Sequence, residues 1–134
     1  MRENYFEDGK WWVSPYNFEP SVRAGLDLPE KVEIHDATLR DGEQTPGVVF
    51  SVDDKLAIAT KLDELGVDRI EAGMPAVSPQ DREAITEISK LGLKSKIFTF
   101  ARAMKVDIDM ALECGADGVV IEVPIGYPKL HTQF

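Results

Sequence analysis

An alternation of strand-like and helix-like segments, beginning at residue 31, constrains the fold of this chain more than any other feature. The strand-like segments start near residues 31, 68, 96 and 118. Between them lie segments whose apolar residues follow helical spacing, at 52–65, 78–91 and 106–114. Such a βαβαβαβ order requires parallel strands joined by right-handed helical crossovers. The sequence therefore predicts an α/β protein.

The ends of the predicted helices carry residues that start and stop helices. Ser51 is the predicted N-cap of the first helix, and Gly66 is its C-terminal stop. Ser78 caps the second helix, with Pro79 at its first position and Gly92 after its end. These residues favour the helix assignments independently of the hydrophobic spacing.

Two architectures fit such a chain, a doubly wound sheet and a (β/α)8 TIM barrel. The phosphate-binding pattern Gly-x-Gly-x-x-Gly occurs at none of the predicted strand-to-helix turns, which disfavours a dinucleotide-binding sheet. A full barrel takes about 250 residues, whereas this chain has 134. We therefore expect residues 30–134 to form a partial TIM-barrel catalytic domain, the N-terminal half of a barrel with about four β-α units. A doubly wound binding domain of unrelated function is the alternative.

Residues 1–29 differ in composition and predict a separate N-terminal arm. Six of the eleven aromatic residues of the chain lie between Tyr5 and Phe18. Asp8-Gly9 stands between two aromatic runs, which predicts a short hairpin with a type I′ turn. We expect this aromatic-rich arm to pack on a neighbouring element. A loosely ordered tail is the alternative.

Charge and composition exclude several classes of partner. The formal net charge is −9 and the sequence pI is about 4.7, which argues against nucleic-acid binding, since that function normally needs a basic face. No apolar run approaches the length of a membrane span. The first residues lack the pattern of a secretory signal, so we expect a cytoplasmic protein. The single cysteine, Cys114, excludes an intramolecular disulfide and is interpreted as a core residue.

Acidic and basic side chains follow the predicted strands at their carboxyl ends, where ligands bind in both architectures. These residues are Asp36, Asp41, Glu43, Glu71 and Glu122, together with Arg40 and Arg102. Crowded carboxylates repel one another unless a cation offsets them. Oxygen ligands suit a hard divalent cation such as Mg²⁺ or Mn²⁺. The pattern therefore predicts a metal-dependent site at this end of the sheet.

The segment Asp36-Ala-Thr-Leu-Arg-Asp-Gly-Glu-Gln44 resembles the signature of the DRE-TIM metallolyases. That family includes isopropylmalate, citramalate and homocitrate synthases and hydroxymethylglutaryl-CoA lyase. Residues 69–79, around Glu-Ala-Gly-Met-Pro, are similar to a segment of isopropylmalate synthases, the branch with the strongest resemblance. Phe100-Ala-Arg-Ala103 is similar to the end of their third strand. The resemblance covers residues 31 to about 123.

The resemblance implies a Claisen-type condensation of acetyl-CoA with a 2-oxo acid in amino-acid biosynthesis. Arg40 would stabilise the developing enolate or carbonyl oxygen, and Asp41 would bind a divalent metal (Mg, Mn, Zn or Co). Glu71 would support the metal site or Arg40 and is counted with the catalytic residues. Gln44 and Arg102, with Arg40, would contact the substrate. The implied partners are a 2-oxo acid, an acyl-CoA and further copies of the chain in a homo-oligomer.

The chain also departs from the family pattern. The family uses a His-x-His pair on a late strand, whereas the only histidines here are His35 and His131. The residues from Pro124 to Tyr127 replace the Ser-x-x-His of the synthases. Lyase-like carbon–carbon cleavage and a silent half-barrel therefore remain alternatives. We interpret His35 as a packed strand histidine, and we expect the isolated chain to be inactive and not a stable monomer.

Overall fold

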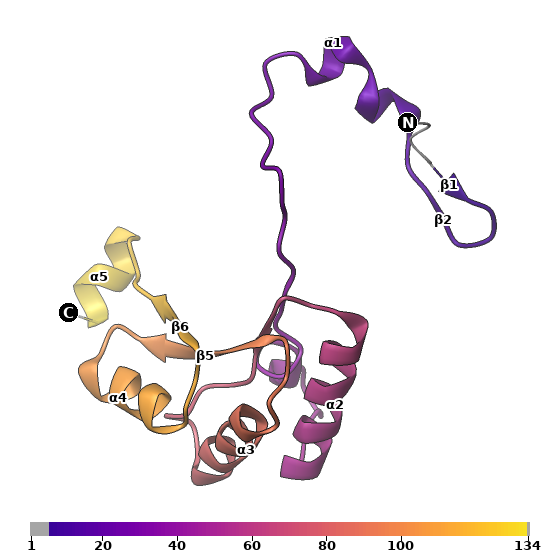
Figure 1. Cartoon of the computed structure of the whole chain (residues 1–134). Coiled ribbons are helices and arrows are strands. Elements are labelled where there is room, and N and C mark those ends of the chain that lie inside the picture. The colour runs from indigo at the N-terminus through magenta and orange to yellow at the C-terminus, as the bar shows by residue number, and fades with distance from the viewer. Residues whose placement is uncertain (1–5, 134) are drawn as a thin grey trace. The chain divides into compact units, whose positions relative to one another are not determined.

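The computed structural model describes residues 6–133, with side chains for residues 6–132 (Figure 1). The chain divides into two compact units, Met1–Val32 and Glu33–Phe134. Among the described residues, no helix has the length and apolar character needed to cross a membrane. The two units are considered separately below.

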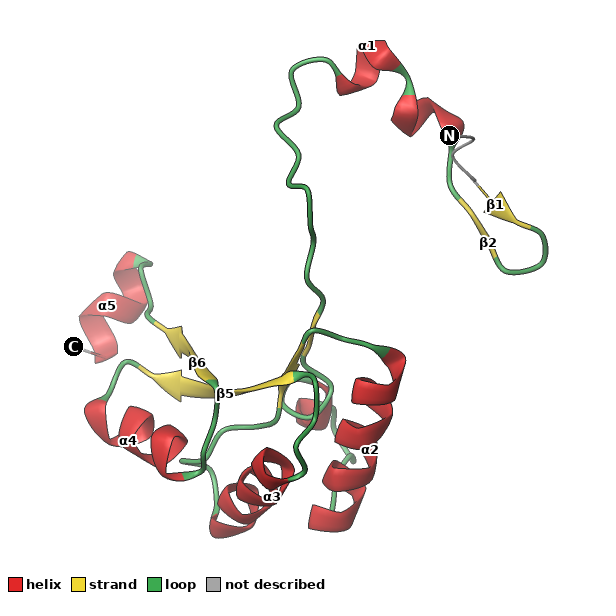
Figure 2. Ribbon diagram, in the orientation of Figure 1, coloured by secondary structure: helices red, strands yellow, loops and turns green. Residues whose placement is uncertain are grey.

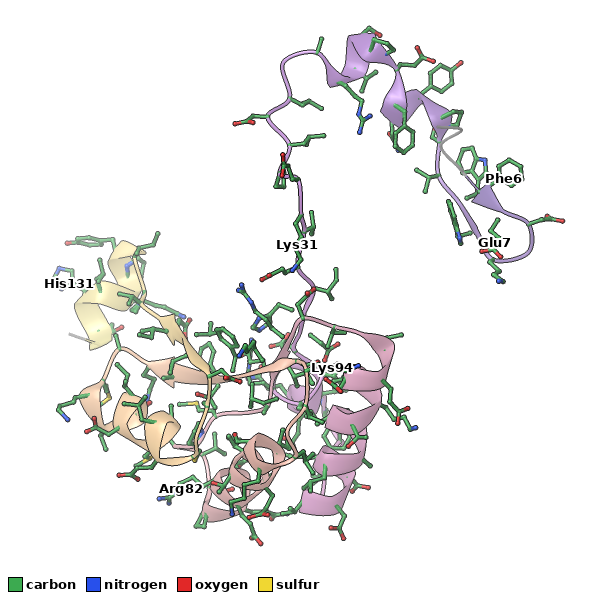
Figure 3. All side chains as sticks on the ribbon, viewed as in Figure 1. Phe6, Glu7, Lys31, Arg82, Lys94 and His131 are labelled. Atoms are coloured by element: carbon green, nitrogen blue, oxygen red, sulfur yellow. The ribbon has the colours of Figure 1, made fainter. Side chains whose placement is uncertain are left out.

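The first unit contains a two-stranded antiparallel ladder and two short helices. Strands β1 (Phe6–Glu7) and β2 (Trp11–Trp12) pair Phe6 with Trp12 and Glu7 with Trp11; Phe6 and Glu7 are labelled in Figure 3. The predicted type I′ turn is wrong, because that turn needs positive φ at both central residues, and Gly9 has φ +71° while Asp8 does not have a positive φ. Helices η1 (Pro15–Phe18) and α1 (Pro20–Arg23) follow, each beginning at a proline. Tyr5, the first of the clustered aromatic residues, lies outside the described residues.

The second unit is built on a four-stranded parallel sheet in the order β3-β4-β5-β6. The strands are β3 (His35–Asp36), β4 (Arg69–Glu71), β5 (Lys96–Arg102) and β6 (Gly118–Glu122). Each strand pairs with the next strand of the sequence, and all pairs are parallel. The predicted α/β alternation is confirmed. This sequential order is consistent with a segment of a (β/α)8 barrel, and within the described strands it lacks the reversal of a doubly wound sheet.

The first strand is shorter than the predicted 31–36. Its neighbour β4 spans only Arg69–Glu71, so the ladder offers partners to His35 and Asp36 alone. Ile34 still accepts backbone hydrogen bonds from Asp68 and Arg69 through its carbonyl. The Ile34 side chain remains 57% exposed, as expected for a residue at the edge of a sheet.

The connecting helices are α2 (Val52–Leu65), α3 (Pro79–Lys90) and α4 (Lys105–Glu113), and α5 (Tyr127–Gln133) follows β6. Figure 2 shows α2, α3 and α4 along one side of the sheet. Ser51 caps α2 through a reciprocal capping box with Asp54, and Gly66 ends the helix at φ +89°. Ser78 caps α3 by accepting a hydrogen bond from the Asp81 amide. The predicted caps of both helices are confirmed.

The core lies between the sheet and these helices. Its buried members are Leu39, Ala59, Val67, Ile70, Ala72, Ile85, Ile88, Ile97 and Cys114. Cys114 is 4% exposed, which confirms its interpretation as a core residue. The last apolar residues of the helical segments predicted at 52–65 and 78–91 are not buried, since Leu65 is 77% exposed and Leu91 is 42% exposed. Both stand at the C-terminal end of their helices, beyond the reach of the sheet.

Thr99 on β5 is fully buried, and its Oγ1 lacks a hydrogen-bond partner among the described residues. A buried hydroxyl without a partner costs about 1–3 kcal/mol of desolvation. Thr99→Val keeps the branched shape and removes the hydroxyl, so we expect the free energy of unfolding to rise by about 1 kcal/mol. Urea denaturation followed by circular dichroism measures the change.

Thr60→Val is the matched control, because the Thr60 hydroxyl donates to the Leu56 carbonyl at 2.9 Å. Thr60→Val removes a hydroxyl that already has a hydrogen-bond partner, so we expect no rise in the free energy of unfolding. A Thr99→Val variant that is no more stable than the parent chain would show that the hydroxyl is satisfied in solution.

Candidate functional site

The loop after β3 forms a tight turn that brings adjacent polar side chains to the carboxyl end of the sheet. The Ala37 carbonyl accepts hydrogen bonds from the amides of Arg40, Asp41 and Gly42, at 3.2, 2.8 and 3.2 Å. The short helix η2 (Gly42–Gln44) continues the turn. Asp36 begins it, because its Oδ1 accepts the Thr38 amide at 2.9 Å. The Asp36 carboxylate therefore stabilises the turn by accepting a backbone hydrogen bond.

Arg40 is held by contacts from three parts of the chain. Its Nε donates to Oε1 of Glu71 on β4 at 2.5 Å, and its Nη1 donates to Oδ1 of Asp41 at 2.8 Å. The guanidinium carbon lies 4.7 Å from the centre of the Phe100 ring on β5. Glu71 is 3% exposed. The structure thus brings together Arg40, Asp41 and Glu71, all singled out from the sequence.

His35 joins the same cluster, which the sequence interpretation missed. Its Nε2 lies 3.2 Å from Oε2 of Glu71, so both carboxylate oxygens of Glu71 have partners. The His35 ring also meets the Phe98 ring edge-on, with centres 5.6 Å apart. The interpretation of His35 as a merely packed strand histidine is therefore incomplete. No signal in the sequence alone reveals this contact, because it depends on the strand register, in which His35 pairs with Arg69, two residues before Glu71 on the same face.

A cavity of about 300 Å³ adjoins this cluster, lined by Arg40 and Gln44. The rest of its wall consists of the carboxylates Glu43 and Asp81, Gly73, and the apolar side chains of Leu39, Val48, Val49, Met74, Val77 and Phe100. An apolar cavity with a few convergent polar groups is typical of small-molecule sites. Gln44 and Arg40 therefore line the same cavity, and their substrate-binding role stays a prediction.

Glu43 belongs to a buried ion-pair network behind the loop. Lys55 of α2 is 2% exposed, and its Nζ lies 2.7 Å from Oε2 of Glu43 and 2.6 Å from Oδ1 of Asp81. Glu43 Oε1 also accepts the Phe50 amide at 3.0 Å. Burial acts to lower the pKa of Lys55, but the hydrogen bonds and charges of Asp81 and Glu43 outweigh it and raise that pKa. Lys55 thereby ties the signature loop to α2 and α3.

Arg102 is engaged elsewhere. Its Nε and Nη2 donate to Oδ2 and Oδ1 of Asp107 at 2.7 and 2.8 Å. Asp107 is 1% exposed. The hydrogen bonds from Arg102 lower the pKa of the Asp107 carboxyl, against the opposing effect of burial. Arg102 is absent from the cavity wall that Arg40 and Gln44 share, so the structure does not bring it together with the other predicted site residues.

A divalent metal was predicted at Asp41. Within the described part of the chain, no group of three or more histidine, cysteine, aspartate or glutamate side chains is arranged to hold a metal ion. The Asp41 side chain is 65% exposed and accepts a hydrogen bond from Arg40. His131 lies on α5, where its Nε2 is 2.9 Å from the Tyr127 hydroxyl (Figure 3). The described residues therefore supply no complete set of ligands for a divalent metal.

Comparison with known proteins identifies the family. A family model described as HMGL-like matches residues 31–134. Homocitrate synthase AksA of Methanocaldococcus jannaschii is 48% identical over 129 residues, covering 96% of this chain and 30% of that protein. In the same organism, (R)-citramalate synthase CimA is 59% identical over 103 residues, covering 77% of this chain and 21% of that protein. Its 2-isopropylmalate synthase is 53% identical over 109 residues, covering 81% of this chain and 21% of that protein.

The chain spans less than a third of the length of these relatives. The family match includes the Asp36–Gln44 signature, the Glu71 strand and the Arg102 strand. All three kinds of synthase match at comparable identity, which agrees with the resemblance seen in the sequence. The chain belongs to the HMGL-like family, the DRE-TIM metallolyases.

Proposed function

We propose that this chain is a catalytic segment of a synthase that condenses acetyl-CoA with a 2-oxo acid. The observation that carries the proposal is the Arg40 guanidinium, fixed by Glu71, Asp41 and Phe100 beside an apolar cavity. The similarity to homocitrate, citramalate and 2-isopropylmalate synthases supports the same reaction class. Because the chain spans only part of those proteins, the activity is proposed for the protein to which it contributes.

Arg40 is suited to stabilise negative charge on oxygen. Two of its N–H groups are used by Glu71 and Asp41, and the guanidinium carries further donors for a ligand in the cavity. A cation already held in place needs no reorganisation when charge develops on an enolate or carbonyl oxygen. Gln44, on the same cavity wall, can hydrogen-bond a substrate and fix its orientation. We propose Arg40 as the catalytic residue and Gln44 as a substrate contact.

Asp41 is proposed as one ligand of a divalent metal, with the other ligands outside the described residues. Its carboxylate is exposed and stands next to Arg40. A divalent cation, when bound, would polarise the carbonyl of a 2-oxo acid. Glu71 is proposed to act by orienting Arg40, since it is buried and bonded directly to the guanidinium.

The sheet is proposed to be part of a (β/α)8 barrel. Strands β3 and β6 each have one neighbour among the described strands and so leave an open edge. Ile121 on β6 is 49% exposed, and Val123 directly after the strand is 54% exposed. Open edges with apolar side chains favour association with further strands. We propose that these edges are covered in the active protein, by the rest of a barrel or by a second copy of the chain.

The test is to express the whole protein to which this chain contributes and to measure coenzyme A release from acetyl-CoA. Short, branched and dicarboxylic 2-oxo acids serve as trial acceptors. We expect release with at least one acceptor, loss of activity after chelation, and no release by the 134-residue chain alone. Failure of every acceptor with a folded, metal-supplemented protein would refute the proposed reaction.

A further inference from the structure

We propose that His35 is a positioning residue for Arg40 and acts through the buried carboxylate of Glu71. The inference rests on the proposed role of Arg40 and adds a residue to the machinery that sets its geometry. Nε2 of His35 lies 3.2 Å from Oε2 of Glu71, while Nε of Arg40 lies 2.5 Å from Oε1. Glu71 is therefore the link between the two basic side chains.

The second hydrogen bond on Glu71 matters because a carboxylate rotates easily. The last side-chain torsion of glutamate is broad, with no narrow preferred angle. A carboxylate held at one oxygen can therefore turn and carry its partner with it. With Arg40 on one oxygen and His35 on the other, the carboxylate plane is fixed. Because the guanidinium is planar and rigid, fixing this plane also fixes the direction of its remaining donors.

The position of His35 is itself determined by the sheet. Strand register places His35 opposite Arg69, so it shares a face with Glu71 two residues further along β4. The Phe98 ring contacts the imidazole edge-on, at 73° between the ring planes. The His35 side chain is 31% exposed and that of Glu71 is 4% exposed. The hydrogen bond between His35 and Glu71 is thus shielded from solvent by the buried Glu71, and the contact with Phe98 orients the imidazole.

The geometry also fixes which imidazole nitrogen carries hydrogen. Oε2 of Glu71 is the acceptor in this arrangement, so Nε2 of His35 must be the donor. A histidine that merely filled space against Phe98 would have no such requirement. Hydrogen on Nε2 is therefore required by the positioning role, and the exchange of Arg40 in variants of His35 separates that role from packing alone.

Two substitutions separate the hydrogen bond from the ring. His35→Phe keeps a ring against Phe98 and removes the donor, whereas His35→Gln keeps an amide donor near the same place. By NMR on the 134-residue chain, we expect hydrogen exchange at Arg40 Nε–H to accelerate about tenfold in His35→Phe, the factor for one lost hydrogen bond. His35→Gln should restore most of the protection. His131→Phe is the matched control, because His131 bonds Tyr127 on α5, and it should leave Arg40 unchanged.

The wild-type chain provides a measurement that needs no variant. Nitrogen-15 spectra should show His35 with its hydrogen on Nε2; hydrogen on Nδ1 alone would overturn the proposal. Unchanged Arg40 exchange in His35→Phe, or equal exchange in His35→Phe and His35→Gln, would also overturn it. In the condensing enzyme, His35→Phe should lower kcat more than it raises KM. If no condensation is found, the proposed function fails while the exchange measurements still decide the role of His35.

Discussion

Replacing Lys55 by methionine is expected to lower the free energy of unfolding of the chain by about 3 kcal/mol at neutral pH. Lys55 is 2% exposed and supplies the positive charge between Glu43 and Asp81. Methionine fills a similar volume, so the loss comes from two carboxylates left without their cation. Glu43 and Asp81 are themselves mostly buried, with side chains 23% and 16% exposed. Urea denaturation at constant salt measures the change.

Lys61→Met is the matched control on the same helix. Lys61 pairs with Glu64 on the surface, where the two side chains are 75% and 57% exposed. Exposed pairs of this kind contribute about 0–1 kcal/mol, so this variant should be nearly neutral. Glu43→Gln combined with Lys55→Met should cost less than the sum of the single changes, because the residues interact directly. Equal losses in Lys55→Met and Lys61→Met would contradict a structural role for the buried network.

The pH dependence of this network follows from the sign of the shift. The pKa of Lys55 in the folded chain is raised above its ordinary value of 10.5. Because this pKa is raised, the stabilisation that charged Lys55 provides is fully present at pH values below its pKa in the unfolded chain. It is lost as the pH rises through its pKa in the folded chain. The difference between the parent chain and Lys55→Met should therefore be constant up to about pH 10 and shrink in stronger alkali.

Local signals in the sequence were sufficient for the helices and the strand order. Ser51 and Gly66 mark the ends of α2 through their own hydrogen bonding and backbone angle, which are local properties. The βα alternation fixed the parallel sheet because a crossover connection admits few other arrangements. The length of β3 was not predictable, since it depends on how many residues β4 offers as partners. Strand ends are set by neighbours that the local sequence does not specify.

The sequence motif predicted which residues belong to the candidate site, but it did not predict the side-chain contacts between them and other elements. Arg40 and Asp41 are adjacent in sequence, so their proximity needed no tertiary information. Lys55 is a lysine in a helix with a predicted apolar stripe, and only the packing of α2 against α3 shows that it is buried. Arg102 ends strand β5, where a substrate contact could lie, but its guanidinium donates to Asp107 in the first turn of α4. Side-chain pairing across elements is the information that the sequence pattern lacks.

Arg40→Lys is expected to reduce the kcat of the condensing enzyme about 100-fold or more, with a smaller effect on KM. An ammonium can keep the charge but cannot bond Glu71 and Asp41 in one plane while stacking on Phe100. The lysine is therefore free to adopt positions away from the developing oxyanion. Steady-state kinetics with saturating acetyl-CoA measure the two constants separately.

Arg69→Lys is the control for an arginine in similar surroundings. Arg69 pairs with Glu33 and lies 5.3 Å from the Phe98 ring, so it reproduces a carboxylate partner and an aromatic contact. It stands at the start of β4, whereas Glu71, the Arg40 partner, stands at its end. Because ligands bind at the carboxyl ends of parallel strands, Arg69→Lys should leave kcat within about twofold of the parent. Near-normal kcat in Arg40→Lys would show that a point charge is sufficient, and equal losses in both variants would show that the effect is structural.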